Sequence, residues 1–152
     1  MQANGKQVAG ARAWVGVVSE SHVRRGVKGG FAQLCHGKSA PLTRMNVGDY
    51  LVYYSPRTDM HAGEPLRAFT ALGKVSGQSV YPFDMGGGFV PKRRDITYAE
   101  VQRRVPVQDL NDELDFIREH ANWGMLARRG HFEINLHDLH AIARAMGVVG
   151  FC

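Results

Sequence analysis

The chain has 152 residues, of which 44% are hydrophobic, so it is long enough for one domain with a sizeable core and too short for two ordinary domains. Its 19 Lys and Arg residues outnumber its 14 Asp and Glu residues, which gives a formal net charge of +5 and favours polyanionic partners. No stretch approaches the ~20 consecutive apolar residues of a membrane-spanning helix, so we expect no membrane partner.

The first residues differ in composition from the rest. Residues 1–11 are polar, contain glycine and lack an apolar segment, which predicts a disordered leader and neither a signal peptide nor an anchor. We expect a single domain over residues 12–152. The two cysteines, Cys35 and Cys152, have no recognised metal or redox spacing, and we interpret both as free thiols. These features predict a cytoplasmic protein.

The first half of the chain reads mainly as short strands. The apolar run Trp14–Val18 predicts a buried strand, and Ser19 can cap a helical turn over residues 22–25 that the glycines at 26, 29 and 30 keep short. Further strands are predicted over residues 50–54, 66–75, 79–83, 89–91 and 93–98. Glycines 86–88 are predicted to form a flexible hairpin tip.

The second half changes to a helical pattern. Leu110, Leu114 and Ile117 recur at helical spacing and predict one helix, and a strand is expected over residues 131–134. A final helix is predicted from the N-cap Asn135 to Gly147, with its buried face formed by Leu136, Leu139, Ile142, Ala143 and Met146. The fold class is therefore α+β, a small mixed β-barrel decorated by helices.

Residues 29–38 are the best candidate for a ligand pocket. The adjacent glycines at 29 and 30 let the backbone approach a partner closely. Phe31, Gln33, His36 and Lys38 then provide an aromatic face, an amide, an imidazole and a cation within eight residues.

The order of these pieces resembles the EVE domain, a PUA-like fold, in its short standalone bacterial form. The resemblance covers about residues 13–147 and rests on a set of short motifs: residues 14–19, His22-Val23, residues 30–34, residues 36–38, Gly48-Asp49, residues 53–56, Pro91, residues 93–95, Trp123-Gly124 and residues 128–130. The resemblance implies a non-enzymatic module that takes a modified base of DNA or RNA out of its strand into a pocket.

A base reader needs aromatic faces, polar groups for the base edge and cations for the phosphates. We predict a ligand-binding set formed by Ser19, His22, Phe31, Gln33, His36, Lys38, Tyr54, Ser55, Phe89 and Trp123. We predict backbone contacts from Arg25, Arg94, Arg128 and Arg129. In a strand, only one of Arg93 and Arg94 can face the pocket. That Phe31 and Trp123 instead belong to the core stays open.

Other chemistry is less well supported. His137 and His140 lie three residues apart on a helix with Asp138, but no third ligand position is indicated, and we expect no metal and no cofactor. Lys38-Ser39 lacks the glycine spacing of a phosphate loop, which argues against nucleotide hydrolysis.

Two other functions are considered. A small amidohydrolase acting on modified nucleosides would use Lys38 with Ser19 or Ser55, and Glu20 or Asp95 are the nearest carboxylates. A sensor of free nucleosides is the other. The sequence predicts neither the modification, the choice between DNA and RNA, nor the oligomeric state.

Overall fold

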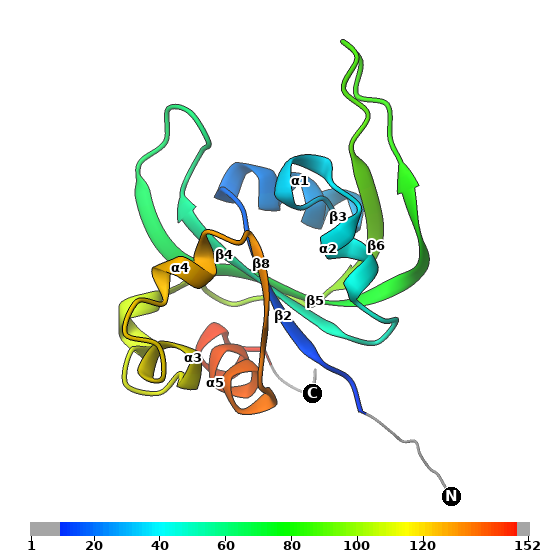
Figure 1. Cartoon of the computed structure of the whole chain (residues 1–152). Coiled ribbons are helices and arrows are strands. Elements are labelled where there is room, and N and C mark those ends of the chain that lie inside the picture. The colour runs from blue at the N-terminus through cyan, green and yellow to red at the C-terminus, as the bar shows by residue number, and fades with distance from the viewer. Residues whose placement is uncertain (1–9, 149–152) are drawn as a thin grey trace, which may run out of the picture.

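The structure of the chain is a computed structural model that describes residues 10–148 (Figure 1). Its strands are β2 (Ala13–Val17), β3 (Phe31–Ala32), β4 (Tyr50–Arg57), β5 (Pro65–Pro82), β6 (Lys92–Tyr98), β7 (Val105–Pro106) and β8 (His131–Ile134). Its α-helices are α1 (Glu20–Gly29), α2 (Ala40–Arg44), α3 (Asp115–Arg118), α4 (Gly124–Ala127) and α5 (Leu136–Met146). Two 3₁₀ turns are η1 (Cys35–Gly37) and η2 (Val107–Leu110). Among these helices none is long and apolar enough to cross a bilayer.

All seven strands belong to one mixed sheet. Its order is β3-β6-β5-β4-β2-β8, with β7 paired to β5. Strands β2 and β4 run parallel, with Val15 opposite Val52, and the other pairs are antiparallel. The α+β class is confirmed. The predicted barrel is an open, curved sheet, because the end strands β3 and β8 do not pair with each other among the described residues.

Helices cover the sheet on both sides because neighbouring strand residues point to opposite faces. In β4, Val52 belongs to a cluster with Leu139 and Ile142 of α5, whereas Leu51 belongs to a second cluster with Val23 of α1. Strand β5 contributes to both clusters. Figure 1 shows α3 and α5 on one side of the sheet and α1 and α2 on the other. Each fully buried leucine or valine of these clusters contributes about 1.5–3 kcal/mol.

The final strand and helix agree with the sequence pattern. Strand β8 spans the four predicted residues, and the Asn135 side chain accepts a hydrogen bond from the Asp138 amide at 2.8 Å, as an N-cap does. Helix α5 ends where Gly147 adopts a φ of 78°. The prediction for Leu136 is wrong, since 43% of this residue is exposed.

Helix α1 is longer than predicted. It runs for ten residues through Gly26, and only Gly30, with a φ of 74°, ends it. A Cβ atom on Gly26 would lie 2.7 Å from the Phe31 carbonyl oxygen, so the glycine permits close packing of the helix on the segment that follows it.

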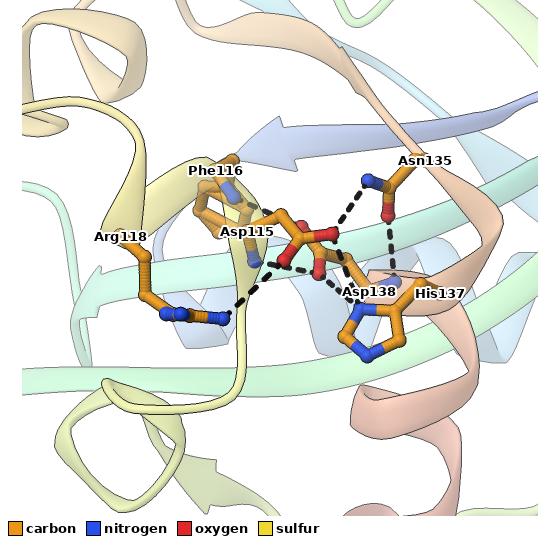
Figure 2. Close-up of polar contacts among 6 residues, drawn as sticks. All are labelled: Asp115, Phe116, Arg118, Asn135, His137 and Asp138. Carbon is orange, nitrogen blue, oxygen red and sulfur yellow. Dashed lines mark hydrogen bonds and ion pairs between the residues drawn. The ribbon is translucent and has the colours of Figure 1, made fainter.

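The single helix predicted around Leu114 is also wrong. The structure has η2 and α3 in its place, separated by turn residues. The carboxylate of Asp138 in α5 accepts hydrogen bonds from the amides of Asp115 and Phe116 at 2.8 and 3.0 Å, which starts a new helix there (Figure 2).

Strand β5 is continuous where two strands were predicted. Gly77 lies within it and packs against Asp95 of β6. The predicted strand at residues 89–91 is wrong, because β6 begins only at Lys92. Glycines 86–88 do lie in the loop between β5 and β6, as expected for a hairpin tip. The predicted leader at residues 1–11 falls almost wholly outside the described residues, as does Cys152.

Candidate functional site

A cavity of about 710 Å³ lies beside α1, within the size range of small-molecule pockets. It is bounded by the start of α1, the segment after β3, the β4–β5 loop, the β5–β6 hairpin and the segment after α4. Figure 1 shows both loops extending on the same side of the sheet, with α1 between them. Ten predicted site residues line it: Ser19, His22, Arg25, Phe31, Gln33, His36, Lys38, Phe89, Arg128 and Arg129.

The polar segment after β3 has an unusual backbone. Cys35, His36 and Gly37 have positive φ values of 49°, 60° and 84°. A Cβ atom on Gly37 would lie 2.5 Å from the Cβ of Pro91, so only glycine fits against the start of β6. This left-handed turn carries the chain from Gln33 to Lys38 along the wall of the cavity.

Arg93 is the site residue that the prediction did not select. Its guanidinium carbon lies 3.8 Å from the ring centres of both Phe31 and Phe83, and its Nε donates to Oε1 of Gln33 at 3.0 Å. Because Arg offers only donors, the atom of Gln33 that it contacts is the amide oxygen, and the NH₂ group of Gln33 is left to donate elsewhere. One face of Phe31 is covered by Arg93, so that face is not available to a base.

The structure places Arg94 away from this cavity, contrary to the predicted phosphate contact. Only 5% of Arg94 is exposed, and its guanidinium donates to the carbonyl oxygens of Leu42, Met45 and Gly77. Burial lowers its pKa, although the group stays charged. Arg94 therefore connects α2 to β5 and β6, and Arg93, on the opposite face of β6, lines the cavity.

His22 gives the cavity a neutral imidazole. Burial lowers the pKa of His22, and the positive charge of Arg25 lowers it further. Its Nε2 atom is buried and has no hydrogen-bond partner within residues 10–148. The other ring nitrogen donates to the backbone of Gln33, so the neutral ring leaves Nε2 as an acceptor for a ligand that carries a donor.

Cations dominate the cavity wall. Six Arg or Lys side chains line it. Four were predicted, at positions 25, 38, 128 and 129, and the other two are Arg57 and Arg93. Asp59 is the carboxylate among the lining residues, and its Oδ1 accepts from the Met60 amide at 2.7 Å. Neither carboxylate proposed for an amidohydrolase lines the cavity: Glu20 binds Arg24 and Arg104, and Asp95 accepts from the Tyr81 hydroxyl.

Three predicted ligand-binding residues lie outside this cavity. Tyr54 and Trp123 line a neighbouring cavity of about 940 Å³, where their ring centres are 5.3 Å apart in an edge-on contact. Tyr54 also belongs to the core, with 5% of it exposed. Ser55 is fully buried, and its hydroxyl lies 2.8 Å from that of Thr70. The structure thus separates the predicted aromatic residues into two groups.

His137 of α5 takes part in a polar cluster with Asp115 and Asp138 (Figure 2). One ligand atom from each of Asp115, His137 and Asp138 lies within 4.8 Å of the others. Both Asp138 oxygens, however, accept from backbone amides, and Oδ2 of Asp115 accepts from Asn135 Nδ2 at 3.0 Å. His140 is not in this group. The contacts join α3 to the start of α5.

Cys35 borders both the cavity and the segment before β8. Its Sγ lies 3.7 Å from the Arg129 carbonyl oxygen, and burial raises the pKa of its thiol. Cys35 is free, as predicted. A thiol with a raised pKa has less of the reactive thiolate form near pH 7 than an ordinary cysteine.

An open mixed sheet with helices on both faces and a cation-lined cavity at the loops of one side defines a domain of PUA-like architecture. The chain matches the EVE domain family over residues 12–145 and belongs to it. It is 51% identical to the UPF0310 protein YdcG of Bacillus subtilis, over 89% of this chain and 92% of that one. A UPF0310 protein of Streptococcus sanguinis is 47% identical over 82% of this chain and 85% of its own length.

Two solved structures share the fold. The NMR structure of Rpa0253 from Rhodopseudomonas palustris has a TM-score of 0.57 at 19% identity, over 90% of this chain and 94% of that one. The crystal structure of Atu2648 from Agrobacterium tumefaciens has a TM-score of 0.56 at 13% identity, over 92% and 96%. At these identities the likeness is one of fold alone.

Proposed function

We propose that the 710 Å³ cavity binds a modified nucleobase of DNA or RNA, without catalysing a reaction. The observation that carries the proposal is the Arg93–Gln33 pair, which fixes a buried amide at the wall of a cation-lined cavity, where its NH₂ group makes no hydrogen bond within residues 10–148. Membership of the EVE domain family supports the same conclusion, because this PUA-like domain is often linked to nucleic-acid binding.

The polar groups of the cavity suit the edge of a base. Gln33 supplies a donor, His22 Nε2 supplies an acceptor, and Ser19 supplies a hydroxyl. A pyrimidine edge carries a carbonyl oxygen, which can accept from Gln33, and an N–H or amino donor, which can donate to His22 Nε2, so such a base would satisfy both side chains. Discrimination by buried polar groups is strong, since a base that lacks the matching atom leaves them unpaired.

The apolar part of the cavity suits the faces of a base. Phe89 is 46% exposed on the β5–β6 hairpin and borders the cavity, so its ring is available for stacking, unlike the covered face of Phe31. Stacking on an aromatic side chain contributes about 1–3 kcal/mol per base, which offsets part of the cost of taking a base out of its strand.

The cations at the rim suit the phosphates on either side of that base. Arg25, Lys38, Arg57, Arg128 and Arg129 line the cavity together with one carboxylate. Each neutralised phosphate of a single strand adds about −0.7 to the slope of log K against log salt. A reader of this kind therefore binds oligonucleotides with a clear dependence on ionic strength.

Binding of matched oligonucleotides with and without cytosine modifications, measured across a range of salt, tests the proposal. The wild-type chain should prefer one modified form, and Gln33→Glu should abolish the preference. Glutamate keeps an oxygen for Arg93 but lacks the NH₂ donor, so the fold is preserved while the base contact is lost. Equal affinity of the wild type for every oligonucleotide, or the absence of a salt slope, would argue against a base reader.

The same preparation distinguishes the two other functions. Lys38 and Ser19 both line the cavity, so release of cytidine from an acylated cytidine, stopped by Lys38→Ala, would support an amidohydrolase. Tight binding of the free nucleoside with no gain from the polymer would support a small-molecule sensor. The surplus of cations around the cavity favours the polymer.

A further inference from the structure

A third cavity, of about 550 Å³, shares Arg129 with the proposed base site. It is lined by side chains of β2, β8, the end of α2, and α3 and α4 with the residues that follow each of them. Arg129 lines this cavity and the first one. The two spaces are therefore neighbours along the protein surface, and the third takes no part in base recognition as described above.

His131 is the most unusual residue of the third cavity. Only 2% of it is exposed, and its ring stacks in parallel on Trp14, with ring centres 4.8 Å apart and an angle of 5°. Neither ring nitrogen has a hydrogen-bond partner among residues 10–148. Burial and, to a smaller extent, the positive charge of Arg44 lower the pKa of His131 to about 4, so the ring is neutral near pH 7 and retains one N–H donor.

The charges around His131 leave a surplus of positive donors. Arg44 and Arg129 both line the cavity, and neither forms an ion pair within the described part of the chain. The one carboxylate of the lining, Glu133, is already held by Arg12 through two hydrogen bonds of 2.9 and 2.6 Å. His120 also lines the cavity, and its Nδ1 lies 2.9 Å from the Phe116 carbonyl oxygen.

Two guanidinium groups and a buried neutral donor match the chemistry of a phosphate group. Guanidinium groups bind phosphate oxygens through paired, charge-assisted hydrogen bonds, and an imidazole N–H can donate to a further oxygen. A bound phosphate would also give a partner to a nitrogen of His131 that otherwise lies buried without one.

We propose that the third cavity holds a phosphate of the bound strand, between Arg44 and Arg129 and within reach of the His131 N–H. The identity of this phosphate rests on the proposed function: because Arg129 lines both cavities, it is a phosphate next to the nucleotide whose base occupies the first cavity. The strand thus passes over Arg129 from one cavity to the other.

Replacing Arg44 tests the proposal, with Lys28→Gln as the matched control. Lys28 is exposed in the last turn of α1 and lines none of the three cavities. Arg44→Gln should weaken oligonucleotide binding about three- to tenfold and reduce the salt slope by about 0.7, the contribution of one phosphate. Lys28→Gln should change neither quantity. Thermal unfolding confirms that both variants fold.

A neutral linkage identifies the phosphate. A methylphosphonate placed next to the target nucleotide should weaken binding to the wild type and have little further effect on Arg44→Gln, because both changes remove the same contact. His131→Phe keeps the ring on Trp14 and removes the donor, so it should weaken the natural strand more than the methylphosphonate strand. Full additivity of the Arg44 and linkage changes would overturn the proposal.

The outcomes of these experiments distinguish the phosphate site from the base site and from a site for a free anion. If Arg44→Gln lowers the salt slope while modified and unmodified oligonucleotides bind equally, the phosphate site stands and base reading fails. If Gln33→Glu abolishes discrimination while Arg44→Gln changes nothing, the phosphate site fails alone. If inorganic phosphate shifts the His131 ring resonances but the oligonucleotide does not, the cavity binds a free anion, which also overturns the proposal.

Discussion

Arg93 and Gln33 are 60 positions apart in sequence, and the Arg93 Nε donates to the Gln33 amide oxygen at 3.0 Å where both side chains are buried. The same guanidinium lies between the rings of Phe31 and Phe83. Arg93 is therefore a positioning residue, which fixes the direction of the Gln33 amide through a contact that only a planar group can make.

Arg93→Lys should weaken binding of the preferred oligonucleotide about tenfold, or ~1.4 kcal/mol, with a smaller change for an unmodified strand. Lysine keeps the charge but cannot lie flat between two rings while donating to Gln33. Fluorescence anisotropy with both oligonucleotides measures the difference. Arg118→Lys, an exposed substitution on α3, is the control. An equal loss for both strands would mean that Arg93 acts only as a charge.

Arg94→Gln should reduce the free energy of unfolding by about 3 kcal/mol, because the three carbonyl oxygens that Arg94 contacts would lose charged donors. Urea unfolding measures this loss. Arg93→Gln, from the other face of β6, should cost less stability and more binding. A stable Arg94→Gln protein with a reduced salt slope of binding would instead restore the predicted phosphate contact.

Stability should fall as the pH drops from about 6.5 to about 4. Burial depresses the pKa of folded His131 to about 4, whereas the unfolded side chain titrates near 6.5, so the unfolded state binds more protons in this interval. Below the pKa of the folded state the loss is complete, and the free energy of unfolding is lower by about 3 kcal/mol. Urea unfolding at several pH values should show this slope, and His131→Phe should flatten it. His22, whose pKa burial also lowers, adds to the slope in the same direction.

Asp138→Asn should destabilise the protein by about 1–3 kcal/mol. The backbone amides of Asp115 and Phe116 both donate to Asp138, and one of them would face the NH₂ donor of the new asparagine. The Tm of the variant measures the loss, and Glu119→Gln, at the exposed end of α3, is the control. Added Zn²⁺ should leave the Tm of the wild type unchanged, since the carboxylates of the cluster are already used. A Tm that rises with Zn²⁺ only when Asp138 is present would identify a metal site.

Sequence patterns predicted the elements that depend on neighbours in the chain. Strand β8 and the two ends of α5 follow from short-range signals, namely alternation, an Asn135 N-cap and a C-terminal Gly147. The composition of residues 29–38 indicated a ligand site; Phe31, Gln33, His36 and Lys38 line one cavity, and ligand binding there stays a prediction.

Features that depend on distant contacts were not predictable in the same way. The helix break before α3 is made by Asp138, some 22 residues further on. Which of Arg93 and Arg94 faces the cavity is decided by the pairing of β6 with β3, where Ala32 lies opposite Arg94. The third cavity needs His131, whose signal in sequence is only that of a histidine at the start of a strand.

The long strand β5 couples the two halves of the hydrophobic core during unfolding. Phe69 and Leu72 belong to one hydrophobic cluster and Ala71 and Val75 to the other, while the same strand pairs with β4, β6 and β7. Neither half of the core can open without breaking β5. The domain should therefore melt as one cooperative unit, and the amides of β4 and β5 should exchange their hydrogens only on global unfolding.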